Sequence, residues 1–151
     1  MAPLQPELHT GITNEMEAAW FRCSTFAVVG ASKDRSKFGN KCFRALLKHK
    51  GEGAVVPVHY KEKAIEGIAA VQLEVLLASI DDHHDLAINI VAPPAVTAAA
   101  VQAALAAGVR HLWLQPGAES AEVFEIAAAA GATLIAGGPC VLVALGEPDS
   151  F

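Results

Sequence analysis

The chain has 151 residues, which suits one domain, and 53% of them are hydrophobic, enough to build a substantial core. Its net charge of −5 argues against a nucleic-acid-binding protein. Three widely spaced cysteines (Cys23, Cys42 and Cys140) form neither a disulfide framework nor a Cys-x-x-Cys pair, and residues 1–10 lack the apolar segment of a secretory signal. We therefore expect a cytoplasmic protein that has neither nucleic acids nor membranes as partners.

The first elements are predicted from their caps and apolar runs. Asn14 and Glu17 are spaced as a capping box for a short helix over residues 15–21, within an N-terminal extension over residues 1–24. Its Trp20 and Phe21 suit packing on the outside of a sheet. Apolar patterns then predict a strand over 25–29, a helix over 39–48, a strand over 53–58, a loop containing Lys61, Lys63 and Gly67, and a helix over 73–79.

The second half of the chain continues this alternation. Residues 86–109 carry no charge, but Pro93 and Pro94 divide them into a strand and a helix that is too short to span a membrane. The helix stops at Gly108, and Ser120 is placed to cap the next helix, which ends before Gly131. The predicted strands cover 86–91, 111–114 and 132–135, with a further short strand within 140–145 and a tail over 147–151.

Five apolar strands alternating with helices predict an α/β fold. We expect a single-domain, three-layer, Rossmann-like doubly wound parallel sheet of five strands over residues 25–146. In such sheets a ligand binds beyond the carboxyl ends of the strands. The turns expected there are rich in small or rigid residues: 30–32, 58–60, 91–94 and 115–117.

The turn Gly30-Ala31-Ser32 is typical of phosphate binding. It links a buried strand to a helix whose amino terminus offers free N–H groups and partial positive charge. The basic residues support this interpretation, because residues 33–63 hold nine Lys and Arg against Asp34, Glu52 and Glu62, a local charge of +6 (9 − 3). Those nearest the expected turns are Lys33, Arg35, Lys37, Lys61 and Lys63.

The residues after the second strand select among nucleotides. The Gly-x-Gly-x-x-Gly fingerprint is absent, and no carboxylate stands after Val58 to hold a ribose diol as in NAD enzymes. His59 and Tyr60 occupy this place, and the basic residues Lys61 and Lys63 that follow favour an additional ribose phosphate. Both NADP and coenzyme A carry one, and charge alone leaves both open.

Five short motifs follow one another along the chain: Phe26–Ser32 (FAVVGAS), Lys37–Gly39 (KFG), Val56–Val58 (VPV), Ile90–Thr97 (IVAPPAVT) and Trp113–Ala118 (WLQPGA). Together they resemble the stand-alone CoA-binding domain family, which is itself similar to the nucleotide-binding domain of the succinyl-CoA synthetase α-subunit. The resemblance covers about residues 21–146 and implies a Rossmann-like fold that binds coenzyme A. At residues 57–60 the chain has Pro-Val-His-Tyr where the family usually has Pro-Val-Asn-Pro or Pro-Ile-Asn-Pro.

The resemblance also implies which residues bind the cofactor. The phosphates would meet Gly30, Ala31 and Ser32, supported by Lys37, Phe38, Gly39 and Asn40. The adenosine side would be lined by Pro57, Val58 and His59. Where the chain departs from the family there, the charge of Lys61 and Lys63 would compensate at the 3′-phosphate. The pantetheine or the adenine would be walled by Val91, Ala92, Pro93, Pro94 and Val96, and the far edge closed by Gln115, Pro116 and Gly117.

The sequence favours binding over catalysis, since it contains no catalytic constellation, and Asp82, His83, His84 and Asp85 are too close in sequence to converge on a metal. Cys140 is a candidate partner for the thiol of coenzyme A. The expected function is therefore non-catalytic binding of coenzyme A or an acyl-CoA. The alternatives are an NADP-binding oxidoreductase or redox sensor, and a CoA ligase subunit that needs a partner chain. The alanine-rich helices would permit a homodimer.

Overall fold

The computed structural model describes residues 14–147, so the predictions for residues 1–13 and for the tail beyond residue 147 lie outside the described residues. The helices are α1 (Glu15–Phe21), α2 (Phe38–Lys50), α3 (Leu73–Ser79), α4 (Pro94–Ala107), α5 (Ala121–Ala130) and α6 (Val141–Ala144), with a 3₁₀ turn at His83–Asp85. The strands are β1 (Thr25–Val29), β2 (Val55–Val58), β3 (Ala64–Ile65), β4 (Ile68–Ala69), β5 (Leu86–Ile90), β6 (His111–Leu114) and β7 (Thr133–Ile135).

Five strands form the predicted parallel sheet, in the order β2-β1-β5-β6-β7. Their register is continuous: Val29 pairs with Val58 on one side and with Ile90 on the other, and Ile90 pairs with Leu114. The chain leaves β1 toward β2 and then returns across β1 to build the other half of the sheet. The strand order thus reverses between β1 and β5, which makes the carboxyl ends of these strands the topological switch point.

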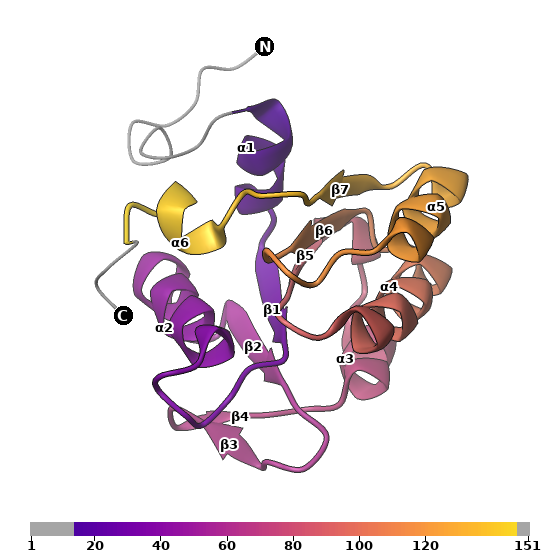
Figure 1. Cartoon of the computed structure of the whole chain (residues 1–151). Coiled ribbons are helices and arrows are strands. Elements are labelled where there is room, and N and C mark those ends of the chain that lie inside the picture. The colour runs from indigo at the N-terminus through magenta and orange to yellow at the C-terminus, as the bar shows by residue number, and fades with distance from the viewer. Residues whose placement is uncertain (1–13, 148–151) are drawn as a thin grey trace.

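Helices cover both faces of this sheet, as Figure 1 shows: α1, α2 and α6 lie on one face, and α3, α4 and α5 on the other. Each face has its own hydrophobic core. Alternate residues of β1 serve the two cores, with Phe26 and Val28 facing α2, and Ala27 and Val29 facing α3 and α4. The largely apolar sequences of β1 and β5 follow from this burial on both sides. The doubly wound α/β fold is therefore confirmed.

Helix α1 begins with the predicted capping box. The Asn14 side chain accepts a hydrogen bond from the Glu17 N–H at 2.9 Å, and its Nδ2 donates to the Glu17 carboxylate at 3.4 Å. This cap orients a short helix whose Trp20 and Phe21 are buried against Trp113 of β6, with ring centroids 5.2 and 5.5 Å from it. The Trp20 indole also donates to the Ile88 carbonyl. This helix therefore packs on the sheet and anchors it through aromatic contacts.

The prediction of a strand within residues 140–145 is wrong, because Val141–Ala144 form the short helix α6. The Gln115 side-chain oxygen accepts a hydrogen bond from the Val141 N–H at 2.9 Å, so this group is not available to a sheet. Buried Val141 and Leu142 pack into the core beside α2. Tertiary contacts thus override the strand propensity of two valines.

Smaller differences concern the segment between β2 and α3. The second strand begins at Val55 rather than Gly53. The predicted loop contains a short antiparallel hairpin of β3 and β4, with Glu66 and Gly67 both at positive φ in its turn. Two-residue strands are too short to show an alternating pattern in a sequence.

No helix within residues 14–147 combines the length and apolarity that crossing a bilayer would require.

Two glycines allow three backbone segments to pack closely at the switch point. A Cβ atom on Gly30 would lie 2.0 Å from the Val91 carbonyl oxygen, and one on Gly39 would lie 1.9 Å from the Gly30 carbonyl oxygen. Gly30 also has φ +92°. Any side chain at either position would therefore push apart β1, β5 and the start of α2.

Replacing Gly30 by alanine is expected to destabilise the protein by about 3 kcal/mol, because the new methyl group meets backbone that cannot move aside. Gly53→Ala is the matched control: its φ is also positive, at +84°, but nothing lies within 4 Å of the added Cβ. That control should lose about 1 kcal/mol. Urea denaturation measures both values, and equal losses would contradict the packing role of Gly30.

Candidate functional site

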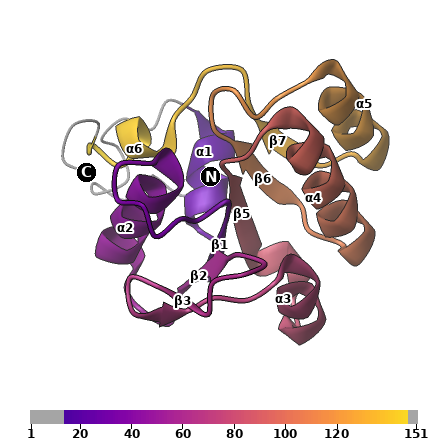
Figure 2. The same ribbon diagram turned by 60° about the horizontal axis from the view of Figure 1, so that its bottom comes forward.

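The candidate site lies at the carboxyl edge of the sheet, around the switch point. Figure 2 brings this edge forward and shows the loop before α2, the β3–β4 hairpin and the amino terminus of α4 gathered there. The β1 turn and the β5 turn are in direct contact, since the Val91 N–H donates to the Val29 carbonyl at 2.8 Å. These loops therefore form one continuous surface above the ends of β1 and β5.

The loop between β1 and α2 is ordered by its own polar groups. Gly30 is exposed, Ala31 is buried and Ser32 is half-buried. Ser32 Oγ accepts from the Asp34 N–H at 3.0 Å, and the Asp34 carboxylate accepts from the Ser36 hydroxyl at 2.6 Å. Since Ser32 Oγ is engaged as an acceptor, its hydroxyl proton is available for donation to a ligand.

The start of α2 is open toward solvent. Lys37 is the N-cap and makes no capping hydrogen bond with its side chain, and the first turn contains no acidic residue. Lys37 and Phe38 are exposed, whereas Gly39 is buried against Gly30. The N–H groups at this helix end and their partial positive charge are thus not neutralised by a local side chain.

Buried Asn40 holds the loop between β1 and α2 in place through hydrogen bonds. Its side chain is fully buried, and its Nδ2 donates to the Ser32 carbonyl at 2.8 Å and to the Glu66 carboxylate at 3.0 Å. Arg44 donates to Asn40 Oδ1. The sequence predicts Asn40 as a cofactor-binding residue, and the structure places it beneath the loop, where its amide groups hold backbone and side chains of the protein.

Two carboxylates of the β2–β4 region tie this loop to the hairpin. The Glu66 carboxylate lies 3.4 Å from Arg35 Nε as well as accepting from Asn40. Glu62 pairs with Lys33 at 2.7 Å, and this hydrogen bond with the ammonium group, together with its charge, lowers the pKa of the Glu62 carboxyl. Lys33 and Arg35 are therefore occupied by these pairs. The sequence does not point to Glu66, because the two-residue strands of the hairpin that presents it leave no recognisable pattern.

Three other cations remain at this edge. Lys37, Lys61 and Lys63 are exposed, and none of them forms an ion pair within residues 14–147. Lys61 and Lys63 follow β2 directly. The side of the site next to β2 thus carries positive charge that the described part of the chain does not compensate.

The end of β2 is built mainly as core. Pro57 and Val58 are buried, and Val58 forms a bridge to Val71. Half-buried His59 folds back on its own loop, because its Nδ1 accepts from the N–H groups of Lys61 and Glu62, both at 2.9 Å. With Nδ1 as an acceptor, a neutral His59 carries its proton on Nε2. This nitrogen can donate to a ligand.

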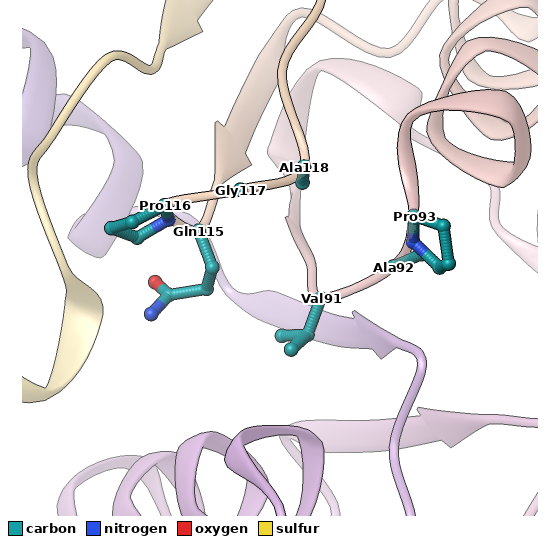
Figure 3. A pocket seen from close by; sticks show the side chains of 7 residues that line it. All are labelled: Val91, Ala92, Pro93, Gln115, Pro116, Gly117 and Ala118. Atoms are coloured by element: carbon teal, nitrogen blue, oxygen red, sulfur yellow. The ribbon is translucent and has the colours of Figure 1, made fainter.

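A pocket of about 300 Å³ opens between the turns that follow β5 and β6. We name it the Gln115 pocket. In Figure 3 the two turns face each other across it, and the Gln115 side chain points away from Pro93 toward the segment that precedes α6. Its lining contains no charged group: Val91, Ala92, Pro93, Gln115, Pro116, Gly117 and Ala118. All but Ala118 are predicted site residues, and Ala118 belongs to the same sequence motif.

The Gln115 amide joins this pocket to Cys140. Gln115 is 4% exposed; its Nε2 donates to Cys140 Sγ at 3.1 Å, and its oxygen accepts from Val141 N–H and from Asn89 Nδ2. Asn89 also donates to the Trp113 carbonyl at 3.1 Å. Cys140 is half-buried, whereas burial strongly raises the pKa of Cys42 on α2. Cys140 thus contacts a residue that lines the pocket.

A second, smaller hollow of about 80 Å³ lies on the other side of α4. We name it the Tyr60 pocket. Val96 is a predicted cofactor-binding residue, and Tyr60 belongs to the turn 58–60 that is expected beside the ligand. Leu73, Ala99 and Ala100 were missed, since apolar helix positions resemble ordinary core residues. Burial, and then a hydrogen bond to Glu74, raise the pKa of the Tyr60 phenol. The lining consists of Val29, Tyr60, Leu73, Glu74, Val96, Ala99 and Ala100.

Other predicted residues lie at the margins. Pro94 is the exposed first residue of α4 and lines neither pocket. The loop from Asp82 to Asp85 forms the 3₁₀ turn near the opposite edge, where the Asp85 carboxylate accepts from the Ser24 N–H. Within residues 14–147 no group of three His, Cys, Asp or Glu side chains is placed to hold a metal ion.

Asn40→Ala is expected to destabilise the protein by about 2 kcal/mol, because it leaves the Ser32 carbonyl and the Glu66 carboxylate without their buried donor. Amide hydrogen exchange at residues 32–37 should accelerate at the same time. Lys41→Ala, at the neighbouring position on α2, is the control for helix effects. Unchanged exchange in the loop of the Asn40 variant would contradict its locking role.

No curated protein matches this chain. A conserved hypothetical protein from Pyrococcus furiosus is 35% identical, with TM-score 0.68, covering 79% of this chain and 97% of its own. A hypothetical protein from Pyrococcus horikoshii is 26% identical, with TM-score 0.73, covering 95% and 96%. A protein from Thermus thermophilus is 25% identical, with TM-score 0.70, covering 85% and 93%.

Comparison with protein families gives a match over residues 24–146 to the family described as CoA binding domain. The match includes β1, the open end of α2, and the turns that form the Gln115 pocket. It thus extends over the whole carboxyl edge described above. The chain belongs to the CoA-binding domain family.

Proposed function

We propose that this protein binds coenzyme A or an acyl-CoA at the carboxyl edge of its sheet without transforming it chemically. Besides family membership, the distribution of charge along this edge carries the proposal. Uncompensated lysines lie next to β2, and an uncharged pocket lies between β5 and β6. Coenzyme A has the same division, since its phosphates and nucleotide lie at one end and its neutral pantetheine arm at the other.

The diphosphate is assigned to the turn at Gly30 and the start of α2. Exposed Gly30 lets a ligand approach the backbone, the Ser32 hydroxyl has a proton to donate, and the helix end is not capped by a side chain. Such an N-terminus favours an anion through its N–H groups and its dipole. Lys37 adds an exposed positive charge beside it.

The 3′-phosphate is assigned to the loop after β2. Lys61 and Lys63 are exposed there, and His59 can donate from Nε2. The charge-assisted hydrogen bonds of these groups would compensate for the usual family residues that the chain lacks at positions 59 and 60. The pantetheine arm is then assigned to the Gln115 pocket, whose small and apolar lining suits a neutral chain.

Binding without catalysis is supported by how the polar groups near the site are used. The side-chain amides of Gln115 and Asn40 form hydrogen bonds with the protein's own backbone and side chains. The carboxylates of Glu62 and Glu66 are held in ion pairs with Lys33 and Arg35.

A homodimer formed through the alanine-rich helices stays a prediction.

Calorimetric titration of the purified protein should show that coenzyme A binds more tightly than dephospho-CoA by roughly tenfold, the loss expected for one charge-assisted contact. The double variant Lys61→Ala/Lys63→Ala should remove most of this difference. Arg110→Ala is the matched control, because Arg110 immediately precedes β6 and so lies at the opposite edge. Tight binding of NADP without binding of coenzyme A would favour an NADP protein instead and refute the proposal.

Cys140 is proposed to lie beside the thiol end of the bound cofactor, since Gln115 lines the pocket and also contacts its sulfur. Incubation with the disulfide of coenzyme A should then yield a mixed disulfide. The Cys140 thiolate attacks one sulfur, the S–S bond of the reagent breaks, and one coenzyme A thiolate leaves. Intact mass should show one added coenzyme A on the wild type and none on Cys140→Ser. Equal addition to both proteins would place the thiol end elsewhere.

A further inference from the structure

One ion pair joins the two loops to which the phosphates of the ligand are assigned. Lys33 follows Ser32 in the loop of the diphosphate. Glu62 lies in the loop of the 3′-phosphate, between Lys61 and Lys63. The Lys33 ammonium nitrogen lies 2.7 Å from a carboxylate oxygen of Glu62. An internal carboxylate therefore stands among the cations assigned to the 3′-phosphate and holds a further cation there.

Both loops are held in place independently of this ion pair. The Glu62 N–H donates to His59 Nδ1 at 2.9 Å, which fixes the backbone on one side. On the other side, Asn40 Nδ2 donates to the Ser32 carbonyl at 2.8 Å, directly before Lys33. The ion pair can therefore open by rotation of two side chains, without rearrangement of either loop.

Opening this ion pair costs little free energy. The Lys33 side chain is 64% exposed and that of Glu62 is 34% exposed. Exposed ion pairs contribute little to stability, because water screens the charges and holding two long side chains together costs entropy. A phosphate monoester carries roughly twice the charge of one carboxylate and offers three strong acceptor oxygens. A phosphate beside this loop would therefore displace Glu62 from Lys33.

The neighbouring ion pair is built differently. The Glu66 carboxylate is 3.4 Å from Arg35 Nε and also accepts from buried Asn40 at 3.0 Å. The Glu66 side chain is only 23% exposed. Because Glu66 is tied to a buried amide, this pair keeps the loop before α2 fastened to the β3–β4 hairpin when Lys33 changes its partner.

We propose that Lys33 is a third lysine for the 3′-phosphate, and that Glu62 holds its ammonium group in the free protein until this phosphate displaces it. The inference rests on the proposed function and deepens it. It makes Lys33 a residue that binds the 3′-phosphate, although the sequence places it next to the diphosphate turn. It makes Glu62 a specificity-determining residue, because its competition weakens the binding of coenzyme A more than that of dephospho-CoA.

The first test removes the competing charge. Glu62→Gln keeps the size of the side chain and should bind coenzyme A roughly fivefold more tightly than the wild type in calorimetric titration, because no exposed ion pair has to open. Its affinity for dephospho-CoA should stay within about twofold. Glu52→Gln is the matched control, since Glu52 is exposed in the turn before β2, at the opposite edge of the sheet. This control should bind both ligands as the wild type does.

A double-mutant cycle separates exchange of partners from simple repulsion. Lys33→Ala should bind coenzyme A roughly threefold more weakly than the wild type, because one contact with the 3′-phosphate is lost. Adding Glu62→Gln to this variant should gain at most about twofold, since no ammonium group remains to be released. A fivefold gain without Lys33 would mean that Glu62 only repels the phosphate, and it would overturn the inference.

The carboxyl NMR signal of Glu62 gives a direct readout. In the free protein the hydrogen bond from Lys33 lowers the pKa of this carboxyl group. Coenzyme A should take this donor away, so the pKa of Glu62 should rise in the complex, whereas dephospho-CoA should leave it low. A pKa that stays low with coenzyme A bound would mean that the ion pair stays closed, and the inference would be wrong.

The outcomes keep this inference apart from the proposed function. If the wild type prefers coenzyme A to dephospho-CoA and Glu62→Gln leaves this preference unchanged, the proposed function stands and only the inference is wrong. If the wild type does not bind coenzyme A, the proposed function fails and the inference fails with it.

Discussion

The whole site depends on one steric constraint, the close contact of three backbone segments at the switch point. The Gly39 Cα faces the Gly30 carbonyl, and the Gly30 Cα faces the Val91 carbonyl, at distances that leave no space for a Cβ atom. These contacts place the start of α2 directly on the ends of β1 and β5. The glycines therefore serve packing as well as ligand approach, and both uses need the same absence of a side chain.

The charged groups around this contact divide into two sets. Lys33 and Arg35 pair with Glu62 and Glu66 and so fasten the loop before α2 to the β3–β4 hairpin. The lysines that follow β2 have no such partners within the described residues, and they lie on the side where a phosphorylated nucleotide is proposed to bind. A local charge of +6 in the sequence thus combines a structural set of cations with a set available to a ligand.

Much of the fold could be predicted because the signals are local. The Asn14 cap, the apolar strands and the glycine after α4 each act through neighbouring residues. The helix at Val141 could not be predicted, since the Gln115 side chain that takes up its N–H lies 26 residues away. In the site, the turn residues were predicted from their composition, whereas the roles of Asn40 and Glu66 follow from a contact between segments 26 residues apart.

The central claim is that coenzyme A lies across the carboxyl edge of the sheet, and amide NMR with increasing coenzyme A tests it most directly. The account predicts that the largest shifts fall on residues 30–32, on the first turn of α2, and on the turns after β2, β5 and β6. The amides near Asp85 and Arg110, at the opposite edge, should stay unchanged. Shifts concentrated at that opposite edge, or no shifts at saturating coenzyme A, would contradict the account.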